Sequence, residues 1–381
     1  MGMIVTLLNS LERLCGRCIG EEDDSIEINQ QASFVEVYSN DEDDINHKQP
    51  TPTKTQKHKR QMTTDVQKQK PMAGSTTIKS DYPMTRGKEE VWNLPKVVWA
   101  SLPASSILIR GDDYNKTKMK CPSPESLYEL VQLDAIQAET TYFDLGTKYE
   151  ISHMLNKNTN KTWTAPSFLI ITWLLPTSQP RLGKKGDEKG YIVTGYFKLR
   201  NETKEILQII THPKYKNNEE AQRRQLNQVL SSNPQWKKRI NGVKLWEKWC
   251  NVAPHDPNMQ RRFKFVPRGD NLGQMGVANW ILKYNGKPTT IKKPGVTSLV
   301  FSHVQEDWME IDVNMHPYPY LFKQAMSHLD QNYFQDLLMT FAFVIEGREA
   351  DELPEVLLGN PIRLVYVKRK NVVMAKNVFG E

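Results

Sequence analysis

The chain has 381 residues, of which 38% are hydrophobic and 25% charged, and its formal net charge is +7. This composition is typical of a globular protein and excludes collagen-like and disulfide-rich secreted scaffolds. Only four cysteines are present, and no run approaches 18 continuous apolar residues, so we expect a reducing compartment and no membrane-spanning helix.

The N-terminus carries a candidate lipid anchor. Gly2 followed by Thr6 fits the N-myristoylation pattern once the initiator methionine is removed. The apolar residues that follow recur at helical spacing and place Cys15 and Cys18 on one face. Because one myristoyl chain binds membranes only marginally, these cysteines are candidates for palmitoylation as a second anchor. We predict a lipidated amphipathic anchor over residues 1–19; an ordinary packed helix with two buried thiols is the alternative.

A charged stretch follows the anchor. Residues 21–44 contain ten acidic residues and no Lys or Arg, whereas residues 48–70 contain seven Lys or Arg and one Asp. Neither block can bury enough apolar surface to offset its ordering entropy, so residues 20–90 are predicted to be a disordered tether. The basic block suits anionic lipid, although a nucleic-acid patch or a solvated linker has the same composition. Residues 1–70 sum to −3, so the body carries about +10, which favours anionic partners.

The composition becomes globular and aromatic from residue 91, and residues 91–381 are predicted to form one large domain. Strand patterns occur at Ser106–Arg110, Phe168–Leu175, Tyr191–Leu199, Arg261–Val266, Trp308–Val313 and Ile362–Val367. The continuous apolar run at Phe168–Leu175, stopped by Pro176, predicts a central strand covered on both faces.

Helical patterns are fewer and lie between the strand patterns. They occur at Asn218–Leu230, Trp236–Trp249 and Tyr320–Leu329. Ser123-Pro124 predicts a helix start, Leu337–Ile345 predicts a helix that becomes a strand near Phe341, and Glu352–Gly359 predicts a turn into a short helix. Since the strands cluster rather than alternate with helices, we predict an α+β fold with a largely antiparallel sheet and packed helices.

One polar cluster is a candidate for chemistry. Glu310 and Asp312 share a strand face, and His316 follows shortly after, which suits a metal or an acid–base pair. The preferred alternative is a polar sheet face whose carboxylates pair with Arg262 and Lys264 across a neighbouring strand. No established catalytic motif and no metal-ligand spacing occurs elsewhere, so we expect a protein that is not an enzyme and that needs no metal or other cofactor.

Basic residues supply a second candidate site. Arg110, Lys118 and Lys120 lie just past a predicted strand end, and Arg262 and Lys264 alternate with apolar residues on another strand. We predict that these five residues contact an anionic ligand; a solvated loop around the first three is the alternative.

The body also contains segments typical of a known family. The most specific are Trp308–Val313, Phe343–Gly347 and Glu352–Gly359. Weaker ones are Ile109–Gly111, Phe168–Pro176, Phe263–Pro267 and Gly286–Pro288. Residues 99–367 resemble the C-terminal domain of the plant protein Enhanced Disease Resistance 2, a domain also found in many protists. The resemblance implies a membrane-linked, lipid-related role and carries over no catalytic residue.

Two departures from the family pattern shape the expected function. Residues 201–260 are expanded, and the pleckstrin-homology and START modules of the plant protein have no counterpart here, so we expect the chain's own N-terminus to supply membrane targeting. We expect a peripheral protein on the cytoplasmic face of a membrane, binding a lipid or an anionic headgroup. The alternatives are a tethered scaffold that recognises a protein through its basic surface or Glu352–Gly359, and an enzyme acting through Glu310, Asp312 and His316. Nucleic acid is a disfavoured partner.

Overall fold

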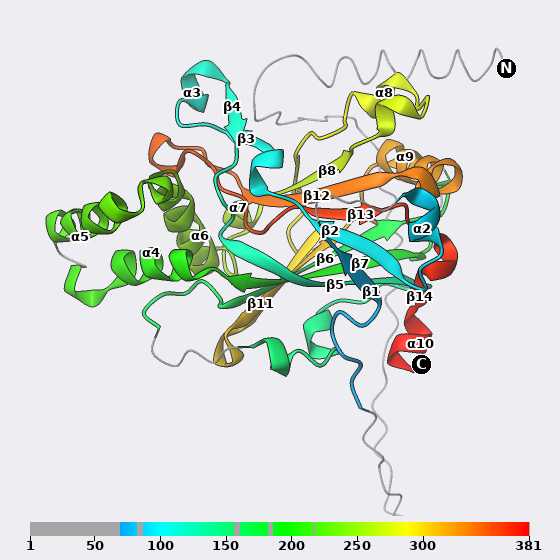
Figure 1. Ribbon diagram of the computed structural model, residues 1–381, viewed down its shortest axis with the longest axis horizontal. Helices are drawn as coiled ribbons and strands as arrows, with labels where there is room; N and C mark the ends of the chain where they lie inside the picture. Colours follow the sequence, from blue (N-terminus) through cyan, green and yellow to red (C-terminus); the bar gives the residue numbers. More distant parts are fainter. Residues whose placement is uncertain (1–68, 82–86, 156–160, 182–185, 216–217, 381) are drawn as a thin grey trace, which may run out of the picture. The chain divides into compact units, whose positions relative to one another are not determined.

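The computed structural model describes residues 69–81, 87–155, 161–181, 186–215 and 218–380 (Figure 1). The predicted anchor, with Gly2, Cys15 and Cys18, and most of the predicted tether lie outside the described residues. Ordered structure begins before residue 91, because β1 (Thr77–Ser80) pairs in parallel with β2 (Val97–Ser101).

The first of two six-stranded sheets has the order β1-β2-β13-β12-β8-β9. Its other strands are β8 (Phe263–Gly269), β9 (Thr289–Thr290), β12 (Leu338–Ile345) and β13 (Ile362–Val365). All of its pairings except β1 with β2 are antiparallel.

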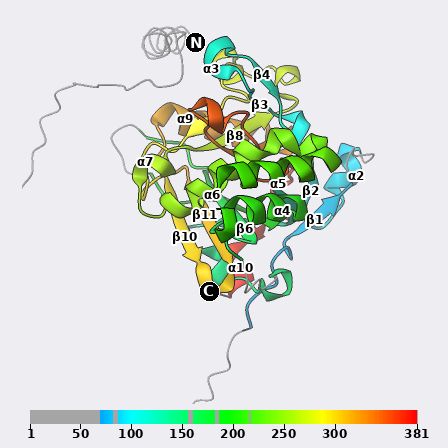
Figure 2. The same ribbon diagram turned by 90° about the vertical axis from the view of Figure 1, so that its left-hand side faces the viewer.

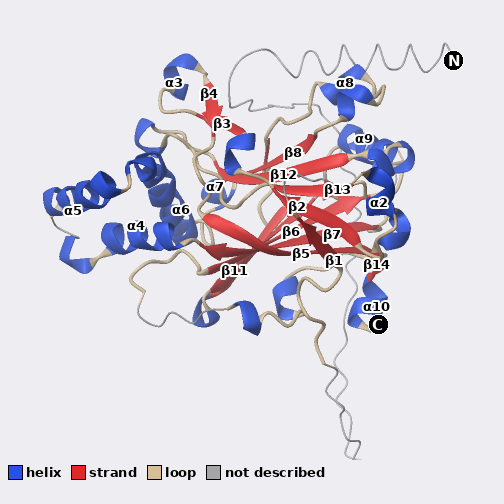
Figure 3. Cartoon of the chain, viewed as in Figure 1, coloured by secondary structure: helices blue, strands red, loops and turns tan. Residues whose placement is uncertain are grey.

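The second sheet has the order β10-β11-β6-β7-β5-β14. Its strands are β5 (Tyr128–Ala138), β6 (Phe168–Pro176), β7 (Gly190–Leu199), β10 (Ser298–His303), β11 (Trp308–Asn314) and β14 (Val373–Met374). β11 runs parallel to β6 and β14 runs parallel to β5, while the remaining pairs are antiparallel. The prediction of an α+β fold with a largely antiparallel sheet is confirmed, although the strands form two main sheets (Figure 3).

The main core lies between the two sheets and is rich in aromatic side chains. Trp173 of β6 packs against Phe341 and Phe343 of β12, with ring centroids 5.2 and 5.3 Å apart. Alternate residues of β6, such as Ile170, point to the opposite face and into a second apolar cluster. The prediction that this strand is covered on both faces is therefore confirmed, because each face meets its own apolar layer.

Three helices cover one side of the sheets, as Figure 2 shows face-on: α4 (Asn201–Thr211), α5 (Glu219–Ser232) and α6 (Ile240–Val252). The indoles of Trp246 and Trp249 on α6 stack at 5.1 Å and are fully buried. The indole nitrogen of Trp246 donates to the hydroxyl of Tyr128 on β5 (2.9 Å), which fixes α6 against the second sheet.

The remaining elements are short or lie at the ends. They are α2 (Lys88–Trp92), β3 (Leu108–Arg110), α3 (Tyr114–Thr117), β4 (Lys120–Pro122), α7 (Pro257–Gln260), α8 (Asn279–Leu282), α9 (Tyr320–Asn332) and α10 (Ala375–Phe379). Within the described ranges, no helix has the length and apolar character needed to cross a bilayer.

Three sequence-based predictions of helix were wrong. Residues 338–345 are strand throughout, because β12 lies between β13 and β8 and gains ladder hydrogen bonds on both sides. Ser123-Pro124 starts no helix; its chain leads into β5. In Glu352–Gly359 only Glu352 is helical, as the end of the 3₁₀ turn Ala350–Glu352; the rest is irregular, with isolated β-bridges at Leu357 and Gly359.

Candidate functional site

A row of buried polar side chains crosses the outer face of the second sheet. Asp312, Thr172, Thr194 and Asp134 stand opposite one another on β11, β6, β7 and β5, so one register line joins all four. None is more than 1% exposed. The hydroxyl oxygens of Thr172 and Thr194 are 3.1 Å apart, which links the two halves of this polar row.

Glu310 and Asp312 hold the segment that covers them. The carboxylate of Glu310 accepts the backbone N–H groups of Leu145 (3.0 Å) and Gly146 (2.7 Å), and Asp312 accepts that of Asp144 (3.0 Å). Burial raises the pKa of both carboxyl groups, and the neighbouring Glu310 charge raises the pKa of Asp312 further. The pair therefore anchors the backbone of the covering segment, and within the described parts of the chain neither side chain forms an ion pair with a cation.

Asp134 plays the same part at the other end of the row. It accepts the backbone N–H groups of Gly74 (2.6 Å) and Thr76 (2.9 Å) and the hydroxyls of Thr76 (2.6 Å) and Tyr196 (3.0 Å). Four donors satisfy both carboxylate oxygens, which meets the cost of burying this group. The polar row thus fastens two separate chain segments onto one sheet face.

His316 does not join the two carboxylates. It follows the end of β11, where its Nε2 lies against Gly190, and its charged neighbours are Asp187, Glu188 and Lys323. Burial lowers the pKa of His316. Across the ranges that the structure describes, no group of three or more His, Cys, Asp or Glu side chains is placed to hold a metal ion.

The predicted pairing of Glu310 and Asp312 with Arg262 and Lys264 is wrong. These cations precede or lie on β8, which belongs to the other sheet. The sequence pattern identified the polar faces correctly but could not tell that the two strands belong to different sheets.

Arg262 and Lys264 instead enter a buried ion-pair network on the outer face of the first sheet. Lys264 Nζ lies 3.2 Å from Glu355 Oε1 and 3.5 Å from Glu346 Oε1. Arg110 reaches the same two carboxylates, donating to Glu346 Oε1 from its guanidinium (3.2 Å) and to Glu355 Oε2 from its backbone (3.2 Å). These contacts join β8, the β3–β4 hairpin and the segment after β12.

The outer part of the network centres on Glu352. Arg262 binds both of its carboxylate oxygens, and the backbone N–H of Arg348 donates to it at 3.0 Å. Burial opposes ionisation of Glu352, but the hydrogen bonds from Arg262 and the backbone outweigh it and lower its pKa to about 2. Burial likewise opposes ionisation of Glu346, and nearby cations, Lys264 first, outweigh it and lower its pKa.

This network changes the interpretation of three predicted ligand contacts. Arg110, Arg262 and Lys264 are at most 7% exposed and are already paired with carboxylates of the protein. The sequence reasoning overlooked Glu346 and Glu355 as their partners, although both lie within the family-like segments quoted above. The acidic residues in those segments were the feature of the sequence from which these ion pairs could have been predicted.

Lys118 and Lys120 are exposed on the β3–β4 hairpin, where Lys120 stands opposite Arg110 in the strand pairing. A second group of exposed lysines lies in residues 271–305, a stretch that contains no Asp or Glu. It consists of Lys283, Lys287, Lys292 and Lys293. Among the described residues none of these four forms an ion pair.

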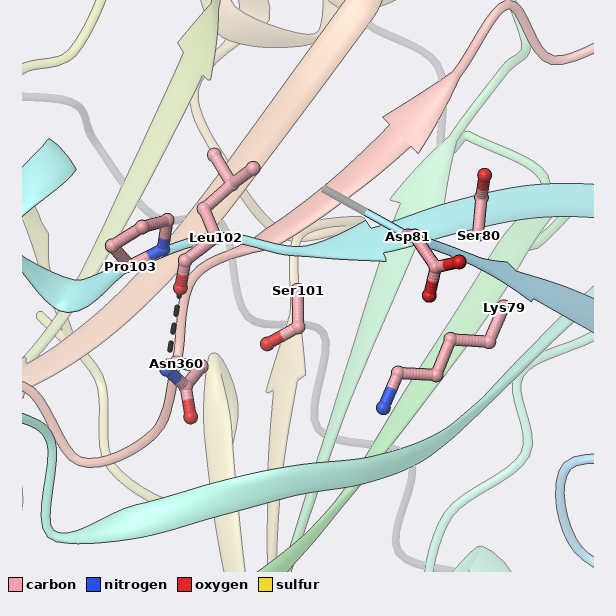
Figure 4. A pocket seen from close by; sticks show the side chains of 7 residues that line it. All are labelled: Lys79, Ser80, Asp81, Ser101, Leu102, Pro103 and Asn360. Atoms are coloured by element: carbon pink, nitrogen blue, oxygen red, sulfur yellow. Dashed lines mark hydrogen bonds between the residues drawn. The ribbon is translucent and has the colours of Figure 1, made fainter. Parts of the chain in front are cut away.

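Two open pockets with mixed linings occur elsewhere on the surface. One, of about 260 Å³, lies where β1 and β2 end; Lys79 and Asp81 line it, and Asn360 donates to the Leu102 carbonyl at its edge (3.2 Å; Figure 4). The other, of about 400 Å³, lies among α4, α5 and α6 and is lined by polar side chains such as Lys244 and Glu247. Neither lining includes the aromatic residues between the sheets.

Comparison with known proteins agrees with the sequence motifs. No curated protein and no solved structure matches the chain significantly. The family model for the C-terminal region of the protein Enhanced Disease Resistance 2 matches residues 99–367, about seven tenths of the chain. This span includes the hairpin, both large sheets apart from their edge strands β1 and β14, and the ion-pair network. The chain therefore belongs to the Enhanced Disease Resistance 2 C-terminal domain family.

Proposed function

We propose that this protein is a peripheral membrane protein with a non-enzymatic regulatory or transport role. Acylation of Gly2, with Cys15 and Cys18 as further acylation sites, holds it at the cytoplasmic face of a membrane. The folded body then contacts anionic lipid headgroups.

The observation that supports this proposal is the segregation of charge in residues 271–305. Four exposed lysines lie there without a single carboxylate, whereas the chain as a whole has 51 Lys or Arg and 44 Asp or Glu. A lysine near an anionic leaflet contributes roughly 1 kcal/mol, so four contribute about 4 kcal/mol when all face the membrane. Since one myristoyl chain gives an association constant of only about 10⁴ M⁻¹, such a contact would make the attachment stable.

The ligand contact now rests on exposed lysines rather than on the buried cations. Arg110, Arg262 and Lys264 are buried and neutralised internally, whereas Lys118 and Lys120 are the two predicted contacts that are exposed. The segment Glu352–Gly359, suggested above as a protein-recognition motif, is buried along its length and is unsuited to that role.

Membrane fractionation tests the anchor. We expect the wild-type chain in the membrane fraction, the Gly2→Ala variant largely released, and the Cys15→Ser/Cys18→Ser variant partly released. Retention of Gly2→Ala in the membrane fraction would contradict the acylation model.

Vesicle binding tests the body. The full chain, produced without acylation, should co-sediment with phosphatidylcholine vesicles that contain phosphatidylserine and not with phosphatidylcholine alone. Binding should weaken as salt is raised, because exposed charges are screened within about 8–10 Å at physiological ionic strength. A chain that ignores anionic vesicles but captures a specific protein partner would favour the tethered scaffold.

A further inference from the structure

The β3–β4 hairpin and the loop between α8 and β9 extend from the same end of the folded body. Figures 1 and 2, viewed at right angles, both place α3, β4 and α8 at the top of the molecule. Between them lies Arg268 of β8, whose guanidinium donates to the Ser106 carbonyl just before β3 (2.7 Å). The aliphatic stem of Arg268 also faces the turn at Gly286, where a Cβ would lie 3.7 Å from its Cδ.

This end combines exposed lysines with exposed apolar side chains. On the hairpin, Leu108 is 59% exposed and Met119 is 69% exposed, and on the other loop Tyr284 is 42% exposed. The same two segments carry exposed lysines: Lys116, Lys118 and Lys120 on the hairpin, and Lys283 and Lys287 on the loop. Exposed apolar side chains together with lysines are the composition of surfaces that enter the interfacial region of anionic membranes.

The hairpin is held rigidly enough to present these side chains. Ile109, next to Leu108, is buried against Val266 and Val344 on the outer face of the first sheet. Arg110 ties the same strand into the ion-pair network. Leu108 stands opposite Pro122 at the base of the hairpin and Met119 lies near its tip, so both extend from a fixed element and binding does not require ordering of the hairpin base.

We propose that this end, formed by the β3–β4 hairpin and the α8–β9 loop, is the membrane-docking surface, and that Leu108 and Met119 insert into an anionic bilayer. The proposal rests on the proposed function and specifies the face and the mode of contact. The lysines reach the headgroups while the two aliphatic side chains enter the acyl boundary. Two carboxylates of the hairpin, Asp112 and Asp113, oppose the contact and are outnumbered by its three lysines.

Vesicle binding by variants of the full, unacylated chain tests the surface. With phosphatidylserine-containing vesicles, Lys283→Ala/Lys287→Ala should weaken binding by roughly fivefold for each lysine. Leu108→Ser/Met119→Ser should weaken it on the order of tenfold or more, because each side chain loses its transfer into an apolar layer. Asp112→Asn/Asp113→Asn should strengthen it by a few-fold.

Matched controls lie on other parts of the body. Lys214→Ala/Lys376→Ala removes two exposed lysines on a 3₁₀ turn after α4 and on α10, and Val304→Ser removes an apolar side chain that is 76% exposed between β10 and β11. Both should bind as wild type does. All these substitutions are at exposed positions, so urea unfolding midpoints should stay unchanged and confirm that each variant is folded.

The outcomes separate the two proposals. If the wild-type chain fails to bind anionic vesicles, the proposed lipid contact of the body is wrong. If it binds but the control variants lose binding as the hairpin and loop variants do, this surface assignment is overturned while the lipid contact stands. If the lysine variants weaken binding and Leu108→Ser/Met119→Ser does not, insertion is overturned and the contact is electrostatic alone. An acidic protein as the true occupant would give hairpin-dependent capture of that protein without vesicle binding.

Discussion

Lys264 and Glu355 lie 3.2 Å apart inside the protein, Nζ to Oε1, and are 5% and 2% exposed. The pair joins β8 to the segment that follows the turn after β12. Glu346 lies 3.5 Å from the same Nζ, so this ammonium group, together with Arg110, offsets the repulsion between two buried carboxylates.

Removal of this ammonium should be costly. Lys264→Met leaves two buried carboxylates with Arg110 as their shared cation and removes the ammonium group that lies between them, and breaking a buried pair in this way costs about 3–5 kcal/mol of unfolding free energy. Urea denaturation measures it. The control is Glu220→Gln, which breaks an exposed pair with Arg224 and should cost less than about 1 kcal/mol. Equal losses in the two variants would show that the buried network contributes no more than a surface pair.

The pKa of Asp312 predicts a pH-dependent stability. Its folded pKa is raised above the usual 3.8 by burial and by Glu310, so the folded state keeps a proton that the unfolded state releases. This group's contribution to stability is therefore largest at low pH and is lost as pH rises from about 4 through the folded pKa. The slope is at most about 1.4 kcal/mol per pH unit.

The variant Asp312→Asn removes that titration. Above about pH 4 its unfolding free energy should fall less steeply with pH than that of wild type. The stability of the variant relative to wild type should therefore increase as pH rises. Thermal or urea unfolding across pH measures this. Asp113→Asn, which removes an exposed carboxylate, controls for a general loss of one negative charge; parallel curves for wild type and Asp312→Asn would contradict the prediction.

Replacement of Asp134 should loosen the segment around Gly74 and Thr76 from the second sheet. Asp134→Ala removes the acceptor for two backbone N–H groups and two hydroxyls, each worth about 1.5–3 kcal/mol when charge-assisted. Hydrogen exchange at Gly74 and Thr76 should accelerate. Exchange at Leu145 and Gly146, which Glu310 anchors, is the internal control and should change less.

A close contact between α6 and the segment after β12 can be tested by a single methyl group. A Cβ on Gly242 would lie 2.3 Å from Cγ2 of Val356, so Gly242→Ala should destabilise the fold by about 1–3 kcal/mol through overpacking. Adding Val356→Ala should recover part of the loss. Gly273→Ala, with no atom within 4 Å of its Cβ, is the control and should have little effect.

The alternation of residue types predicted which face of a strand a side chain occupies better than it predicted which strands lie in the same sheet. Alternation correctly separated Phe263 and Phe265, in the core between the sheets, from Arg262 and Lys264, in the ion-pair network. It could not indicate which strands lie side by side, because pairing is set by contacts far apart in sequence. That gap produced the wrong partners for Glu310 and Asp312.

Helix predictions failed where tertiary contacts overrode local signals. Residues 338–345 include Leu, Met and Ala, which suit a helix, yet they form a central strand with neighbours on both sides. The long helical periodicities were reliable: the pattern at Tyr320–Leu329 corresponds to α9 and that at Asn218–Leu230 to α5. The sequence reasoning missed Glu346 and Glu355 as site residues, because their role depends on cations that are distant in the sequence and close only in the folded structure.

Asp134 also helps to carry a mechanical force applied to the folded body from its N-terminal side. Its carboxylate accepts hydrogen bonds from the backbone N–H groups of Gly74 and Thr76, only a few residues after residue 69, where the described chain begins. A pull on the N-terminal side of the body is resisted first where Met72 bridges Glu150 and then at Asp134 on β5, the second strand from one edge of the second sheet. The force would then pass from β5 to β7 and β6 along the polar row. The pairing of β1 with β2 would be loaded only after the hydrogen bonds to the Asp134 carboxylate had broken.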